Sequence, residues 1–175
     1  TEIPSFTTVN SGVTSISNTV TVTASKDGCT SATLSFNVTI FPVPGAFAGD
    51  QNICSEEFTS VLITGSVAGT TFTWIIGTVT GPVTGQAAGS GNLISQQLIS
   101  AASATVEYII TPTANGVDGP TTTVTVSVSP KPVGNSLTES SVCSGTTLNI
   151  TPTSNVSGTT YTWVGSNGSG GGGSI

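Results

Sequence analysis

The residues best suited to chemistry are the three cysteines, Cys29, Cys54 and Cys143, and eight acidic residues, because the chain has two lysines and no histidine. A thiolate nucleophile needs a neighbouring base, and without histidine no base is at hand. A zinc site also needs cysteine and histidine at short spacings, which the sequence lacks. We therefore predict that the chain is not an enzyme and holds no metal cluster.

The acidic residues are scattered, and none forms the closely spaced oxygen-ligand loop of an EF-hand. Asp27 and Asp118 lie in Gly-containing turns that we take to be equivalent, where a carboxylate commonly satisfies nearby backbone amides. Together with Asp50 they are the candidates for a weak calcium site. The prediction is that no cofactor is present, with calcium as the alternative.

Two tryptophans, Trp74 and Trp163, end the same phrase, "GTT(F/Y)TW", and each follows an aromatic residue two positions earlier, Phe72 or Tyr161. Residues two apart on a strand share one face. We expect these pairs to fill the core of a β-sandwich, as a central Trp does in immunoglobulin-like domains. The alternative is an exposed aromatic platform that stacks sugars.

The composition favours an extracellular β-protein. Only 6% of the residues are charged, whereas Val, Ile and Thr, which favour strands, are abundant. A net charge of −6 leaves no basic surface for a phosphate backbone, so nucleic acid is not expected as a partner. No apolar run reaches the ~20 residues needed to span a bilayer.

The chain contains a repeat. Cys54–Trp74 and Cys143–Trp163 are identical at nine of 21 aligned positions, 89 residues apart. A second pair, "FNVTIFPVP" (36–44) and "VTVSVSPKP" (124–132), lies 88 residues apart and aligns two Pro-x-Pro segments. The repeat is therefore about 88–89 residues long.

Proline cannot donate to a sheet, so each Pro-x-Pro segment should end one unit. On this frame residues 1–44 are the C-terminal half of one repeat, 45–132 a complete repeat, and 133–175 the N-terminal half of the next. Either the chain is a window on a longer protein or half-units of neighbouring copies complete one another.

Alternating apolar and polar residues predict the strands of the complete unit, and Gly-rich breakers separate them. Val124, Val126 and Val128 share a face that should meet the core. We expect an all-β fold of tandem antiparallel immunoglobulin-like sandwiches. The expected strands are Thr59–Ile63, Thr70–Ile76, Val79–Val83, Ile94–Ile99, Thr105–Thr111 and Thr121–Ser129.

The phrases "CS", "TPT", "GTTYTW", "ATVEYIITPT" and "VTVSVSPKP" resemble the PKD-like repeat found in tandem in very large cell-surface proteins of Bacteroidota, including gliding-motility adhesins exported by type IX secretion. The resemblance covers nearly all of 45–175 and the second half of 1–44. It implies structural roles for Cys54, Trp74 and the Val124–Val128 strand, and no catalytic residue. Two departures are Val117 in place of a turn cysteine, and "SEEF" in place of "SGTT" after Cys54.

The cysteine pairing stays open. If the disulfide of a unit joins its early cysteine to the turn cysteine, Cys29 and Cys143 would pair outside residues 1–175 and Cys54 would lack a partner. A small buried hydrophobe is then the favoured interpretation of Cys54. A Cys29–Cys54 bridge is the alternative.

The leading functional hypothesis is a stalk segment of a long bacterial cell-surface adhesin or filament that serves adhesion and gliding, attached at the outer membrane. Its partners would be neighbouring repeats, surface or motility-machinery proteins, or extracellular glycans. A second hypothesis is a spacer or carbohydrate-binding module of a large secreted hydrolase. A third is a self-assembling extracellular fibre whose subunits exchange half-domains.

Overall fold

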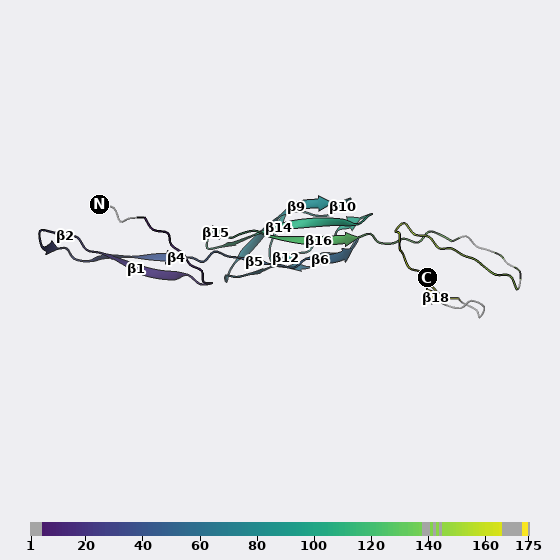
Figure 1. Cartoon of the computed structure of the whole chain (residues 1–175), viewed down its shortest axis with the longest axis horizontal. Helices are drawn as coiled ribbons and strands as arrows, with labels where there is room; N and C mark the ends of the chain where they lie inside the picture. The colour runs from purple at the N-terminus through teal and green to yellow at the C-terminus, as the bar shows by residue number, and fades with distance from the viewer. Residues whose placement is uncertain (1–4, 138–140, 142, 144, 166–172, 175) are drawn as a thin grey trace.

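The computed structural model describes residues 5–137, 141, 143, 145–165 and 173–174. Three parts follow one another along the long axis: an N-terminal segment (5–44), a central segment (45–132) and a C-terminal segment (the described residues from 133 to 174) (Figure 1). All regular structure in these residues is strand, which confirms the all-β prediction. No helix of the described part is long and apolar enough to cross a membrane.

The N-terminal segment is a long hairpin. Its strands are β1 (Ile16–Val22), β2 (Ser25–Lys26), β3 (Cys29–Thr30) and β4 (Leu34–Ile40). β1 pairs antiparallel with β4, and β2 with β3. At the tip, Asp27 and Gly28 have φ of 49° and 81°, the left-handed pair that a two-residue hairpin turn requires.

The central segment contains strands β5 to β16. Its strands are β5 (Ala46–Phe47), β6 (Gln51–Cys54), β7 (Val61–Leu62), β8 (Thr64–Gly65), β9 (Thr71–Thr80), β10 (Val83–Thr84), β11 (Gly89–Ser90), β12 (Leu93–Ile94), β13 (Ile99–Ser100), β14 (Ala104–Ala114), β15 (Val117–Asp118) and β16 (Thr122–Ser129). The main sheet has the order β11-β9-β14-β16-β6, with β15 also on β14. Within it only β16 and β6 run parallel, an exception to the expected antiparallel pairing. The short pairs β5–β8, β7–β12 and β10–β13 form the opposing layer.

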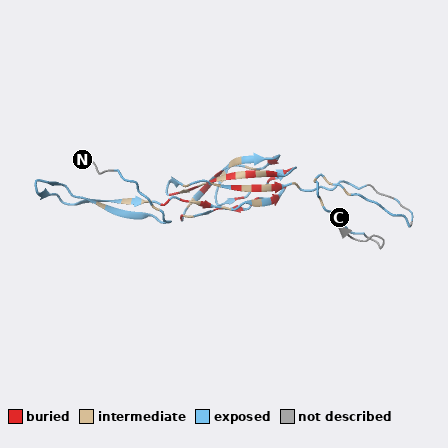
Figure 2. Cartoon of the chain, viewed as in Figure 1, coloured by how far each residue is buried: buried red, intermediate tan, exposed pale blue. Residues whose placement is uncertain are grey.

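A single core lies between these two layers. Val124, Val126 and Val128 face it from β16 and are at most 2% exposed. They pack with Tyr108 of β14 and with Leu98 of the opposing layer, which are both fully buried. Figure 2 shows that burial is concentrated in the central segment. The immunoglobulin-like β-sandwich predicted from the sequence is therefore confirmed.

Several strand limits differ from the prediction. β9 runs on to Thr80 and β10 begins at Val83, so the expected Val79–Val83 strand is divided between them. The expected Ile94–Ile99 strand is interrupted between β12 and β13. Around the interruption the backbone amide of Gln96 donates to the Thr59 hydroxyl, 2.9 Å away, rather than to a neighbouring strand.

The 88-residue offset reappears in the strand register. Ile16↔Ile40 corresponds to Ala104↔Val128, and every pair of β1 with β4 has its counterpart in β14 with β16. The turn Asp27–Gly28 likewise corresponds to Asn115–Gly116, with φ of 52° and 75°. The two Gly-containing turns are therefore equivalent, as expected, but the placement of Asp118 in its turn is wrong, because Asp118 lies on β15 after the turn.

The C-terminal segment contains few regular pairs. β17 (Thr162–Trp163) pairs antiparallel with β18 (Gly173–Ser174). This Gly-Ser pairing with Thr-Trp repeats the pairing of β11 with Thr73 and Trp74 of β9.

Candidate functional site at the Pro-x-Pro junctions

The candidate calcium ligands do not converge. Asp27 lies in the tip of the N-terminal hairpin. Asp50 accepts a hydrogen bond from the amide of Thr125 (2.8 Å), and Asp118 accepts one from the hydroxyl of Thr113 (2.6 Å). Across the described ranges, no group of three or more His, Cys, Asp or Glu side chains is placed to hold a metal ion.

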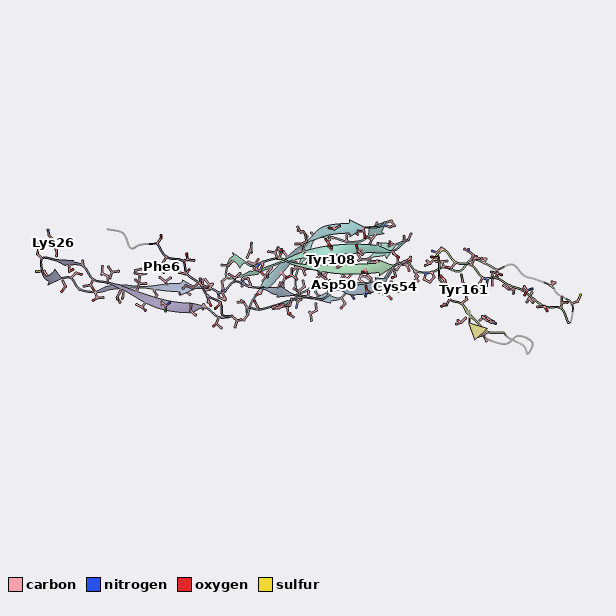
Figure 3. The ribbon with its side chains drawn as sticks, in the orientation of Figure 1. Phe6, Lys26, Asp50, Cys54, Tyr108 and Tyr161 are labelled. Carbon is pink, nitrogen blue, oxygen red and sulfur yellow. The ribbon has the colours of Figure 1, made fainter. Side chains whose placement is uncertain are left out.

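The three cysteines are free and exposed. The expectation that Cys54 is buried is wrong, because Ile53 takes the inward position of β6 and its neighbour must point outward. Figure 3 places Lys26, which pairs with Cys29, far from Cys54 along the long axis, so the alternative Cys29–Cys54 bridge is absent.

The pairing of an early with a turn cysteine within one unit is also excluded by geometry. Cys54 lies opposite Ser129 at one end of the main sheet, whereas Val117 lies beyond Ala114 at the other end. β14 runs from Ala104 to Ala114 between these ends and separates them by about 33 Å. A disulfide requires α-carbons within about 7 Å.

The aromatic pair of the central segment is part of the core. Trp74 and Phe72 are each 6% exposed. The indole N–H of Trp74 donates to the carbonyl of Ala87 (3.1 Å). An indole held in this way has no open face on which a sugar ring could stack.

Behind Trp74 lies a connected set of polar groups centred on Gln96. Its side-chain amide donates to the carbonyl of Ala87 (2.7 Å), and its Oε1 accepts from the amide of Ala87 (2.9 Å) and from the hydroxyl of Tyr108 (2.9 Å). Burial raises the pKa of Tyr108 to about 12. These bonds satisfy the polar ends of the two largest core side chains, as burial requires.

The corresponding pair of the C-terminal segment is not enclosed. Trp163 is 47% exposed and Tyr161 is half-buried. The expectation that they fill a core is therefore wrong for the described residues. The physical reason is that β14 and β16 supply the core around Trp74, and the described residues 133–165 contain no counterpart of these two strands.

A second set of polar contacts lies at the two Pro-x-Pro junctions. At the first junction, Pro42 and Pro44 are fully buried, so this segment is packed rather than free. Gly45 and Ser66 then exchange two hydrogen bonds, from Gly45 N to Ser66 Oγ (2.7 Å) and from Ser66 N to Gly45 O (3.0 Å). The linker is thereby fixed to the unit that follows it.

The hairpin β14–β15 also approaches this junction. A Cβ atom at Gly119 would lie 1.7 Å from the carbonyl oxygen of Pro44, so only glycine fits there. The hydroxyl of Thr122 donates to the carbonyl of Ala46 (2.8 Å). Residues late in the unit, Gly119 and Thr122, thus pack against its first residues, at Pro44 and Ala46.

The second junction repeats the anchor with different side chains. Val133 N donates to Asn155 Oδ1 (2.7 Å), and Asn155 N donates to Val133 O (3.3 Å). Val133 is 88 residues after Gly45, and Asn155 is 89 residues after Ser66. The same exchange of two hydrogen bonds therefore fixes both linkers.

An ion pair holds the second linker to the unit before it. Lys131 Nζ lies 2.7 Å from Glu56 Oε2, and both side chains are more than half exposed. The hydrogen bond to Glu56 raises the pKa of Lys131 above its usual value. Glu56 has φ of 75°, and its counterpart 89 residues later is Gly145, with φ of 85°.

Sequence reasoning identified the Pro-x-Pro segments but missed the side chains that fix them. Ser66 and Asn155 differ in type, so the alignment of the two repeats does not mark them. The departure "SEEF" introduces Glu56 at a position where the next unit has a glycine.

In a comparison with known families, residues 51–132 match the sequence model of the PKD-like domain. The match supports the assignment of the central segment to this repeat family. Domains of this kind are generally non-catalytic and suggest an extracellular structural or adhesive part. A comparison with curated proteins found no match.

Proposed function

We propose that this chain, with its PKD-like central domain, is a stalk segment of a long adhesin or filament on the outer surface of a bacterium. Successive sandwiches would add length, and the distal part of the same protein would bind the target. The observation that carries the proposal is the fixation of both linkers by the same two-bond exchange, Gly45 with Ser66 and Val133 with Asn155. A stalk that projects a binding tip needs units that do not swivel freely.

The surface composition supports this role. With 6% charged residues the chain offers little to electrostatic partners, and its described residues contain no constellation of base, nucleophile and metal. By its resemblance to the repeats of gliding-motility adhesins, we place the parent protein among the type IX-secreted surface proteins of Bacteroidota. Its contacts would then be neighbouring repeats, motility-machinery proteins and extracellular glycans at the tip.

A spacer in a secreted hydrolase is the second candidate. The sandwich and its fixed linkers suit a spacer equally well. The buried indole of Trp74 disfavours the carbohydrate-binding form of this hypothesis. A glycan array probed with the chain separates the two forms, since a binding module should bind some of the arrayed sugars and a spacer should bind none.

The first experiment measures the native polypeptide and its location. An antibody against residues 45–132 should label intact cells, protease treatment of intact cells should remove the label, and the denatured native polypeptide should far exceed 17.3 kDa. Antibody-treated cells should also lose adhesion or gliding. Label that appears only after lysis would overturn the surface assignment.

The stiffness of a junction is tested directly by pulsed electron–electron distance measurements between spin labels at Val43, in the first linker, and Thr78, which are both exposed. The cysteine-free chain should give one narrow distance distribution. Ser66→Ala removes the acceptor for Gly45 and should broaden it, whereas Ser90→Ala, outside the junction, should not. Equal widths in all three chains would contradict a stalk fixed at this linker.

A further inference from the structure

The chain enters the main sheet at β6 and leaves it at β16, and these two strands lie side by side. They pair in parallel, with Gln51 opposite Val126 and Cys54 opposite Ser129. Both strands run along the long axis of the chain, towards the second junction (Figure 1). In a parallel pair, the start of one strand and the end of the other lie at opposite ends of the ladder.

Two hydrogen bonds extend this pairing towards the first junction. The hydroxyl of Thr122 donates to the carbonyl of Ala46 (2.8 Å). The backbone amide of Thr125 donates to the carboxylate of Asp50, also over 2.8 Å. The partners of these bonds are 76 and 75 positions apart in the sequence. The entering chain therefore lies along the last strand before the ladder begins.

Two contacts extend the pairing towards the second junction. The backbone amide of Ser55 donates to the carbonyl of Ser129 (2.8 Å). Beyond this bond, Lys131 Nζ lies 2.7 Å from Glu56 Oε2, and these two residues are again 75 positions apart. The pairing of the entering chain with the leaving chain therefore continues up to the second linker.

Tension that passes from one linker to the other would reach this pairing from its two opposite ends. A pull on the first linker acts on β6 from its N-terminal end, and a pull on the second linker acts on β16 from its C-terminal end. Because the strands are parallel, the two forces slide one strand along the other, and the hydrogen bonds of the ladder share the load. In an antiparallel pair, both forces would act at the same end and break the bonds one after another.

The inner side of the pairing is closed to water. Ile53 of β6 is 7% exposed and Val128 of β16 is 2% exposed, and both belong to the core. A hydrogen bond that is shielded from water is electrostatically stronger than one in solvent. The core therefore strengthens the ladder on this side.

We infer that residues 46–56 and 122–131 form a mechanical clamp, which keeps the central sandwich folded when tension passes from one linker to the other. The clamp resists tension in this direction, and it does not resist a pull that separates the two strands from one end. In a row of such units, each sandwich would transmit a pull to the next unit without unfolding.

The clamp rests on the stalk proposal for its use but not for its existence. The stalk proposal fails if the parent protein is not at the cell surface. The clamp fails if the force that unfolds the central segment does not depend on the direction of the pull. The two failures are therefore distinguishable.

The test is a single-molecule pulling experiment on the full chain with its three cysteines changed to serine. Val43→Cys with Val133→Cys, both at exposed positions, attaches the handles of an optical trap to the two linkers. Val43→Cys with Thr121→Cys attaches both handles at one end of the clamp, because Thr121 is exposed and precedes β16. The released length, up to roughly 3.3–3.6 Å for each residue between the handles, identifies unfolding of the central segment.

The pull between the two linkers should require an unfolding force at least about twofold higher than the pull from one end at the same speed, because several ladder bonds carry the load together. The two chains should have the same thermal midpoint by circular dichroism before the handles are attached, so that a difference in force reflects direction rather than stability. Equal forces in the two geometries, or a lower force between the linkers, would overturn the inference.

Two carboxylates provide matched variants for the pull between the linkers. Asp50 and Asp118 each accept one hydrogen bond, of 2.8 and 2.6 Å, but only Asp50 belongs to the clamp. Asp50→Ala should shorten the lifetime of the folded central segment at constant force about tenfold, because a hydrogen bond to a charged group contributes on this scale. Asp118→Ala should leave this lifetime unchanged. Equal lifetimes of the two variants would overturn the inference.

Discussion

The hydroxyl of Tyr108 should make the central sandwich sensitive to alkali. Tyr108 is fully buried, and its pKa is raised from 10.0 to about 12 by desolvation. The unfolded chain releases this proton near pH 10 and the folded chain near pH 12, so stability from this group is complete below pH 10 and falls as the pH rises toward 12. At 1.36 kcal/mol per pKa unit, the loss is about 1.4 kcal/mol at pH 11 and approaches about 2.7 kcal/mol above pH 12.

The comparison that isolates this effect is Tyr108→Phe. At pH 7 the variant loses the hydrogen bond to Gln96 Oε1 and should unfold about 0.5–1.5 kcal/mol more easily, because Ala87 N still satisfies that oxygen. Between pH 9 and 11 it should lack the decline of about 1.4 kcal/mol seen for the native chain. Urea unfolding followed by circular dichroism measures both. An identical alkaline decline in the two chains, or phenolate absorbance of Tyr108 appearing near pH 10, would refute the reasoning.

Three further changes follow from the packing of the central segment. Trp74→Ala should lower the free energy of unfolding by about 3–5 kcal/mol, because the indole is buried. Phe58 is 62% exposed, so Phe58→Ala should lower it by less than about 1 kcal/mol. Equal losses in the two variants would contradict a buried indole. Gly119→Ala places a Cβ against the carbonyl oxygen of Pro44 and should lower the free energy of unfolding by about 1–3 kcal/mol. Gly49 has open space around it, so Gly49→Ala should leave the midpoint of thermal unfolding unchanged. Glu56→Gly relieves a left-handed backbone conformation and should raise the free energy of unfolding in urea by about 0.5 kcal/mol. Because it also removes the ion pair with Lys131, it should broaden the spin-label distance distribution across the second junction. A lower free energy of unfolding would show that the ion pair contributes more than the backbone strain costs.

The fold was predictable because its signals are local. Alternation in Thr122–Ser129 and the Asn115–Gly116 turn each specify their structure without help from distant residues. The parallel pairing of β6 with β16 was not predictable, since it joins residues more than 70 positions apart through backbone atoms alone. The interruption at Gln96 was missed for a similar reason, because its partners Thr59 and Tyr108 come from other parts of the chain.

The junctions were only half predictable. Proline marks a linker in any sequence, but whether that linker is free or fixed depends on which side chains reach it. Ser66 and Asn155 are ordinary loop residues by type, and only their bonds to Gly45 and Val133 give them a role.

The ion pair at the second junction positions the linker rather than stabilising the fold. Lys131 corresponds to Val43 in the first linker, and Glu56 corresponds to Gly145 in the next unit, so both members of the pair differ from their counterparts. A left-handed φ at a non-glycine residue lowers the free energy of unfolding, and an exposed ion pair raises it only slightly. Since neither member improves the folding of its own unit, the effect of the pair falls on the linker, which it holds to the unit before it. The charge it uses is one of only two cations in the chain.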